Sequence, residues 1–193
     1  MFNRSIKTLA GILALAIMVG TASSSTTYAQ QQGTNQVDVF FANDAAWSLA
    51  SEISLSQIAQ QLAVRQETQQ FAQRMINEHR QDLRELSQLA SAKSIVLPSD
   101  LINSVGGAGP RIPNQVTPRE QFDIVYLMGQ IRAHEKALEL FQNEMAMGND
   151  AEIKDYATRA VPRLQEDLNQ ARQALLAVIG TSVPTPVPNP PQQ

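Results

Sequence analysis

The chain has 193 residues, no cysteine and a formal net charge of −3. Without cysteine it can form no disulfide framework and carries no lipobox cysteine for lipid attachment, so its stability must come from packing. Its acidic balance and small share of aromatic residues, 5%, exclude the basic stripe and the stacking platforms of nucleic-acid-binding proteins. We therefore expect no nucleic-acid partner.

The N-terminal segment has the pattern of an export signal. Arg4 and Lys7 precede an unbroken apolar run at 9–19. As a helix rising about 1.5 Å per residue, this run covers roughly 17 Å, which is less than the roughly 30 Å hydrocarbon core of a bilayer. We therefore predict that 1–29 is a signal peptide cleaved after Ala29. The mature protein, with a net charge of −5 after loss of the two basic residues, would be periplasmic or secreted and would have no transmembrane helix.

Four segments of helical periodicity follow a polar leader at 30–36. We place a single domain at 37–179, followed by a proline-rich tail at 180–193 that we expect to be extended and disordered. The predicted helices cover about 37–63, 66–92, 117–148 and 149–179.

The connections between these helices predict their arrangement. Almost no linker separates the first two helices, which should form an antiparallel hairpin. Residues 93–116 are instead rich in glycine and proline and form the one long connection. It could reach roughly 80 Å if extended, whereas a helix of about 28 residues is roughly 42 Å long. The sequence therefore predicts an all-α four-helix bundle with one long crossover connection between helices 2 and 3.

Local signals mark the ends of the later helices. The third helix opens with a capping box from Thr117 to Glu120 and ends at Gly148. Asn149 is predicted to cap the fourth helix, with Glu152 as its capping-box partner.

Apolar residues recur at steps of three and four along each helix and define its inward face, on which we place Leu55 and Met145. Pro162 lies inside the fourth helix and should kink it or remove a backbone hydrogen bond. Three further groups have predicted environments: core filler at Met75, Met128, Met145 and Met147, packing near the bundle end at Trp47, and a solvated face at Arg80, Asp82, Arg84 and Glu85.

Ionisable residues interrupt these apolar faces at one depth of the bundle. Glu52, His79 and His134 each stand where an apolar residue is expected, and the two histidines are the only ones in the chain. Counting about 1.5 Å per residue from the helix turns places the three at nearly the same level. Asp167 lies at matching depth, at the edge of its face. These four residues are the predicted ligands of one divalent transition metal: zinc, manganese, iron or copper.

A metal-free interpretation is the alternative. A buried glutamate and a histidine can satisfy each other by hydrogen bonding, and Ser48, Ser51 and Ser56 lie close to Glu52 in the sequence. In that case the bundle would be a non-enzymatic scaffold for partner binding. The sequence contains no nucleophile motif, phosphate-binding glycine loop or Ser/His/Asp arrangement, so no catalytic residue is predicted.

Several motifs also carry a family resemblance. They are Asn43-Asp44-Ala45-Ala46, the segments 52–59 and 71–79, Phe122-Asp123 with His134, and Val161-Pro162-Arg163-Leu164. Over about 37–177 the chain resembles the domain-of-unknown-function family 4142 (DUF4142). The resemblance implies an exported bacterial protein with a ferritin-like four-helix bundle, in a family that has no agreed activity.

The chain departs from related patterns at its polar positions. Family members usually carry a further histidine in the fourth helix where this chain has Asp167, whose shorter side chain still offers a carboxylate. Ferritin-like di-iron proteins use Glu-x-x-His pairs, but Ile76 and Ile131 stand three residues before the histidines here. Di-iron oxidase or ferroxidase chemistry is therefore not expected.

Overall fold

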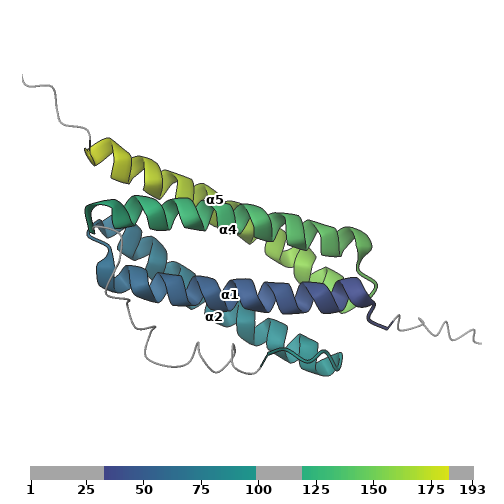
Figure 1. Cartoon of the computed structure of the whole chain (residues 1–193). Coiled ribbons are helices and arrows are strands. Elements are labelled where there is room, and N and C mark those ends of the chain that lie inside the picture. The colour runs from purple at the N-terminus through teal and green to yellow at the C-terminus, as the bar shows by residue number, and fades with distance from the viewer. Residues whose placement is uncertain (1–32, 99–118, 183–193) are drawn as a thin grey trace, which may run out of the picture. The chain divides into compact units, whose positions relative to one another are not determined.

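The computed structural model describes residues 33–98 and 119–182. Those residues form the helices α1 (Gln36–Leu62), α2 (Gln66–Ala92), α4 (Arg119–Met147) and α5 (Ala151–Ser182), shown in Figure 1. The described residues contain no strand, which confirms the predicted all-α four-helix bundle. The signal peptide predicted at 1–29, most of the leader, the connection at 99–118 and the tail beyond 182 lie outside the described residues.

Each helix packs against two antiparallel neighbours. α1 contacts α2 and α4, and α5 contacts the same two helices (Figure 1). At one end of the bundle, Lys93 after α2 forms an ion pair with Asp150 before α5, with Nζ 2.9 Å from Oδ2. At the other end, the backbone N–H groups of Val64 and Arg65 donate to the Asp123 carboxylate near the start of α4. The end of α2 and the start of α4 therefore lie at opposite ends of the bundle, as a crossover requires, and the path of the connection itself stays a prediction.

Side-chain caps determine where α1 and α5 begin. The Asn35 side chain accepts from the N–H groups of Val37 and Asp38, and the Asp38 side chain accepts from the Asn35 N–H. α5 is capped by Asp150, whose Oδ1 accepts from the two N–H groups that follow Ala151, at 3.0 and 3.2 Å. The prediction of Asn149 as the cap was therefore wrong by one residue. Asp150 also pairs with Lys93 through its other carboxylate oxygen, Oδ2.

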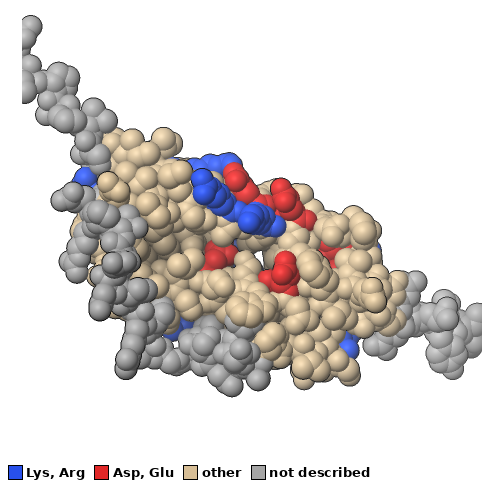
Figure 2. All heavy atoms as spheres, viewed as in Figure 1, with Lys and Arg blue, Asp and Glu red and all other residues tan. Residues whose placement is uncertain are grey.

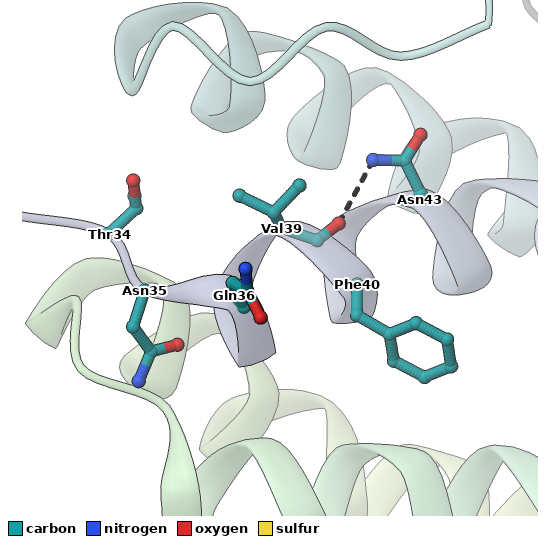
Figure 3. A pocket seen from close by; sticks show the side chains of 6 residues that line it. All are labelled: Thr34, Asn35, Gln36, Val39, Phe40 and Asn43. Carbon is teal, nitrogen blue, oxygen red and sulfur yellow. Dashed lines mark hydrogen bonds between the residues drawn. The ribbon is translucent and has the colours of Figure 1, made fainter.

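The outer side of the first turn of α1 is open. Figure 3 shows the pocket there, where the Asn43 amide donates to the Val39 carbonyl at 2.9 Å and the Phe40 ring points away from the bundle. The Phe40 side chain is 59% exposed.

Two apolar clusters fill the core on either side of a polar layer. One contains Phe41 and Phe141, whose rings meet edge to face at 4.8 Å between centroids. The other contains Phe71 and Leu127. Buried polar side chains lie at the boundary between the two clusters on every helix: Glu52 and Ser56 on α1, His79 and Asp82 on α2, Gln130 and His134 on α4, and Asp167 on α5. The common depth inferred from residue counting is therefore observed.

Some inward-facing predictions were wrong. On α1, Leu55 is 50% exposed and the next residue, Ser56, is buried instead. A hydroxyl is tolerated there because Ser56 Oγ lies 2.8 Å from the Tyr126 hydroxyl, so both buried groups are hydrogen-bonded. From Glu52, a step of three leads to Leu55 and a step of four to Ser56. The period of an α-helix is 3.6 residues, so steps of three and four must alternate, and here the step of four keeps the buried face toward the core.

The predicted burial was also wrong at several other positions. Met75 is buried as predicted, but three methionines and the tryptophan are exposed: Met128, Met145, Met147 and Trp47. Asp82, predicted on the solvated face, is buried. α5 continues through Pro162 as one helix, although the proline ring nitrogen has no hydrogen to donate. Among the described helices, none has the length and apolar character needed to cross a bilayer.

Candidate metal centre

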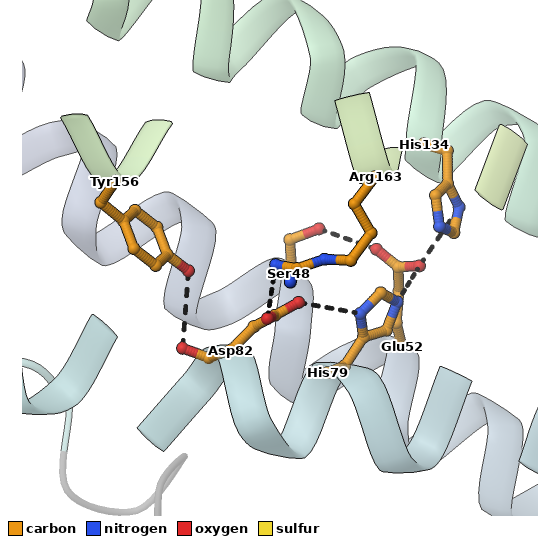
Figure 4. A network of polar contacts seen from close by, with 7 residues as sticks. All are labelled: Ser48, Glu52, His79, Asp82, His134, Tyr156 and Arg163. Carbon is orange, nitrogen blue, oxygen red and sulfur yellow. Dashed lines mark hydrogen bonds and ion pairs between the residues drawn. The ribbon is translucent and has the colours of Figure 1, made fainter. Parts of the chain in front are cut away.

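Three helices bring one carboxylate and two imidazoles together in the polar layer. Glu52 comes from α1, His79 from α2 and His134 from α4, and all three side chains are buried (Figure 4). One potential ligand atom from each residue lies within 4.8 Å of the other two. Glu52 Oε2 is the common neighbour, at 3.2 Å from His79 Nε2 and 3.5 Å from His134 Nδ1. We call these three residues the triad.

Glu52 and His79 form a buried ion pair. Burial by itself disfavours the charged form of His79, but the Glu52 and Asp82 carboxylates outweigh it and raise the pKa of the ring to about 10. Burial likewise opposes ionisation of Glu52, and the two histidines reverse that effect and hold its pKa below its ordinary value. Ser48 supports the charged carboxylate by donating its hydroxyl to Glu52 Oε1 at 3.1 Å.

His134 is held by its own helix. Its Nδ1 lies 2.9 Å from the Gln130 carbonyl oxygen, which can only accept. In the neutral ring the proton therefore sits on Nδ1, and Nε2 keeps its lone pair. Nε2 is buried without a hydrogen-bond partner among the described residues. Nε2 is thus the nitrogen that the neutral ring offers to a metal, whereas the 3.5 Å contact with Glu52 is made by Nδ1.

Asp82 and Arg163 support the triad from outside it, and sequence analysis missed both. Asp82 Oδ2 lies 3.8 Å from His79 Nδ1, which is an ion-pair distance but too long for a hydrogen bond. Asp82 is in turn held by Arg163, whose Nη2 donates to Oδ1 at 2.6 Å across the α2–α5 interface. This contact could not be predicted from helical periodicity, because the two residues are 81 positions apart. Its effect is to keep a second carboxylate beside His79.

Asp167 is buried in the polar layer but lies outside the 4.8 Å triad. Burial raises its pKa, and the nearby His134 and His79 act in the opposite direction. The Glu78 carboxyl is its direct neighbour, and burial followed by the charge of Asp167 raises the pKa of Glu78 to about 7. Asp167 therefore contributes a buried carboxyl to the polar layer from α5, and its role as a metal ligand stays a prediction.

The donor set suits a borderline divalent ion. Two imidazole nitrogens and a carboxylate oxygen are ligands that zinc, manganese, iron and copper accept, whereas magnesium and calcium prefer oxygen ligands alone. The buried triad can hold such an ion. To do so it must give up the proton that joins His79 to Glu52, because a metal replaces that proton.

Comparison with solved structures finds a similar fold. A DUF305 fragment from Deinococcus radiodurans superposes with a TM-score of 0.58 at 14% identity, covering 74% of this chain and 97% of that one. At this identity the likeness concerns the fold alone. No curated protein matches the chain.

Comparison with family models gives a more specific result. The model described as "Domain of unknown function (DUF4142)" matches residues 23–174. This match covers most of the chain, including both histidines and every helix of the bundle except the last turns of α5. It confirms the resemblance carried by the sequence motifs, and the chain belongs to the DUF4142 family.

Proposed function

We propose that this protein is exported to the cell envelope and that its bundle binds one divalent transition metal through Glu52, His79 and His134. The observation that carries the proposal is the convergence of the three side chains from three helices, with ligand atoms within 4.8 Å of one another. The buried Nε2 of His134, which has no hydrogen-bond partner among the described residues, also supports it, because its lone pair is available to a metal.

The metal would be zinc, manganese, iron or copper, and Asp167 is the candidate for a fourth protein ligand. Export is supported by the basic and apolar N-terminal pattern that ends near Ala29.

Elemental analysis of the protein purified from its native compartment tests metal binding. We expect close to one equivalent of a single transition metal in the wild type and less than about a tenth of an equivalent in the double variant His79→Leu/His134→Leu. A wild type that carries less than about a tenth of an equivalent would contradict the proposal.

Expression of the full chain in a Gram-negative bacterium tests export. The mature protein should be recovered outside the cytoplasm with Gln30 as its first residue, as read by mass spectrometry. An uncleaved chain in the cytoplasm would contradict this part of the proposal.

A metal-free polar network is the second candidate, and the Glu52–His79 ion pair favours it. That pair already satisfies the charges of both groups without an ion. On this account the double leucine variant would be as stable as the wild type or more so, because apolar packing often replaces a buried polar pair without loss. Its biological role would also survive the double substitution, which a metal-dependent role would not.

A further inference from the structure

The triad is enclosed, so an ion that binds there has to pass between helices. Glu52 is only 5% exposed, and the two histidines are more deeply buried still. Two surface grooves lie along seams between helices near the polar layer. One lies between α1 and α4 and has a volume of about 240 Å³. The other lies between α2 and α5 and has a volume of about 440 Å³.

The groove between α1 and α4 leads directly to a triad carboxylate. Ser48 lines this groove, and its hydroxyl donates to Glu52 Oε1 at 3.1 Å. The other oxygen of the same carboxylate, Oε2, is the one that contacts His79 and His134. Figure 2 shows this face of the molecule, which is hollowed near its middle, with acidic side chains beside the hollow. One hydrogen bond therefore separates the lining of the groove from the triad.

Oxygen atoms follow one another along α1 from the groove to the triad. Asp44, Ser48 and Glu52 are four residues apart, so their side chains lie along one face of the helix, about 6 Å from one to the next. Ser51 adds a second hydroxyl to the groove. Carboxylate and hydroxyl oxygens can replace water around a divalent cation. Lys136 on α4 also lines the groove and opposes a cation by its charge.

The groove between α2 and α5 is less suited to a cation. Glu67 and Glu166 line it, but so does Arg74, whose guanidinium lies over the Phe71 ring at 5.4 Å from the centroid. The Phe71 ring in turn packs against the His134 ring, with 6.4 Å between centroids. A cation on this side would meet a positive charge and then an aromatic ring before it reached an imidazole.

We infer that the groove between α1 and α4 is the route by which a divalent cation enters and leaves the triad. This inference rests on the proposed metal binding. Asp44 attracts the hydrated ion at the mouth of the groove, and Ser48 exchanges its hydrogen bond to Glu52 for contact with the ion. Asp44 and Lys136 are not ligands of the bound ion, so they act on the rate of entry through their charges.

Stopped-flow mixing of the mature chain with Cu²⁺ at low ionic strength tests the route. Trp47, the single tryptophan of the chain, lines the groove, so its fluorescence should be quenched as copper binds. We expect Asp44→Asn to slow association about two- to fivefold and Lys136→Gln to speed it by a similar factor. Glu166→Gln makes the same change of charge as Asp44→Asn in the other groove and should leave the rate unchanged. Equal rates in the two α1–α4 groove variants, or an equal effect of Glu166→Gln, would overturn the inference.

A pair of variants that add bulk tests the same route independently of charge. Ala137→Val narrows the groove between α1 and α4, while Ala177→Val narrows the groove between α2 and α5. An obstacle on the route raises the barrier equally in both directions. We therefore expect Ala137→Val to slow copper association and dissociation by the same factor, at least fivefold, with Kd unchanged.

The outcomes separate the route from the metal site. Wild-type rates in Ala137→Val, a change in its Kd without equal slowing of both rates, or equal slowing in Ala177→Val would overturn the route. A wild type whose fluorescence shows no saturable quenching and which retains no copper after dialysis would instead refute the proposed metal binding itself.

Discussion

His79 is the residue on which the charge balance of the polar layer depends. It is protonated between two carboxylates, those of Glu52 and Asp82, and burial fails to remove that proton because both neighbours are negative. Arg163 neutralises the second carboxylate. In the metal-free protein these four groups carry no net charge together, which explains how a charged ring can be buried.

The proton on His79 should make metal affinity depend on pH. Because the pKa of this ring is about 10, the metal-free site is protonated at neutral pH and binding must displace one proton. We predict that affinity for Zn²⁺ rises about tenfold per pH unit between pH 6 and 8. Competition titrations with a chromophoric chelator measure the affinity at each pH. Calorimetry in two buffers of different ionisation enthalpy counts the protons released on binding. An affinity that is constant over this range would contradict the assignment.

Asp82 should influence the metal although it is not a ligand in the triad. Asp82→Asn removes the carboxylate that keeps His79 in place, and outer partners of metal-bound histidines typically contribute about 10–100-fold to affinity. We predict a loss of that size, measured by the same competition titration. Glu85→Gln, on the exposed side of α2, is the control and should bind as the wild type does. Equal affinities for the two variants would show that Asp82 is not coupled to the site.

The triad was predictable from sequence and its supporting residues were not. Glu52, His79 and His134 stand out because each interrupts an apolar periodicity, and residue counting then gives their depth. Asp82 carries the same kind of side chain but follows Asn77, His79 and Arg80 in a polar stretch, so nothing in its neighbourhood separates it from a surface residue. Its burial depends on Arg163, a contact that exists only once α2 and α5 have packed.

The glycine at the end of α4 is needed for space rather than for backbone conformation. Gly148 follows α4, and no glycine among the described residues has a positive φ. A Cβ at this position would lie 2.7 Å from the Glu144 carbonyl oxygen and would also collide with the Glu144 carboxylate. The glycine predicted as a helix stop is therefore present for a different reason, namely that it leaves room for a buried glutamate.

Two glycine substitutions, one in α4 and one directly after it, should have opposite effects on stability. Gly148→Ala forces a close backbone contact, and overpacking of this kind costs about 1–3 kcal/mol. Gly129 lies on the exposed side of α4 with nothing within 4 Å of its would-be Cβ, so Gly129→Ala should stabilise by about 0.5–1 kcal/mol through helix propensity. Urea unfolding measures both changes. Destabilisation by Gly129→Ala, or none by Gly148→Ala, would contradict the structure at this end of α4.

At the scale of the whole molecule, the bundle end near Gly148 gives stability a pH dependence. Burial, together with the neighbouring Asp38 carboxylate, raises the pKa of Glu144 to about 8 from its ordinary value of 4.5. The native state therefore keeps a proton that the unfolded chain loses between these values, and stability falls as pH rises from about 4.5 to 8. Asp38 has the opposite effect on stability, and at lower pH. Burial alone would raise its pKa, but hydrogen bonds from backbone N–H groups lower it, so stability is lost there as the pH falls.

The substitution Glu144→Gln should remove this loss of stability with rising pH. The amide keeps the size of the protonated carboxyl but cannot ionise, so we predict that the variant loses less stability than the wild type between pH 5 and 8 and is the more stable protein at pH 8. Urea unfolding at several pH values measures it. Glu139→Gln, at an exposed position on α4, is the control and should follow the wild type. A Glu144→Gln profile parallel to that of the wild type would contradict the raised pKa.

The fold as a whole was more predictable than its details. Long periodic segments with short turns at Ala63–Arg65 and Gly148–Asp150 give four helices and two antiparallel hairpins before any contact is known. The inward face of each helix was harder to predict than the helix itself. Steps of three and four alternate along that face, and one wrong step exchanges Leu55 for Ser56. Asp150 and Asp82 both pair with residues distant in the sequence, Lys93 and Arg163, and periodicity in a single sequence does not reveal such contacts.

Calorimetric titration of the metal-free mature chain with Zn²⁺ tests the shared role of the triad most directly. We predict saturation at one equivalent, and at least a hundredfold weaker binding in each of Glu52→Gln, His79→Leu and His134→Leu, with Glu139→Gln unchanged. Absence of saturable binding in the wild type, or equal binding in all five proteins, would contradict it.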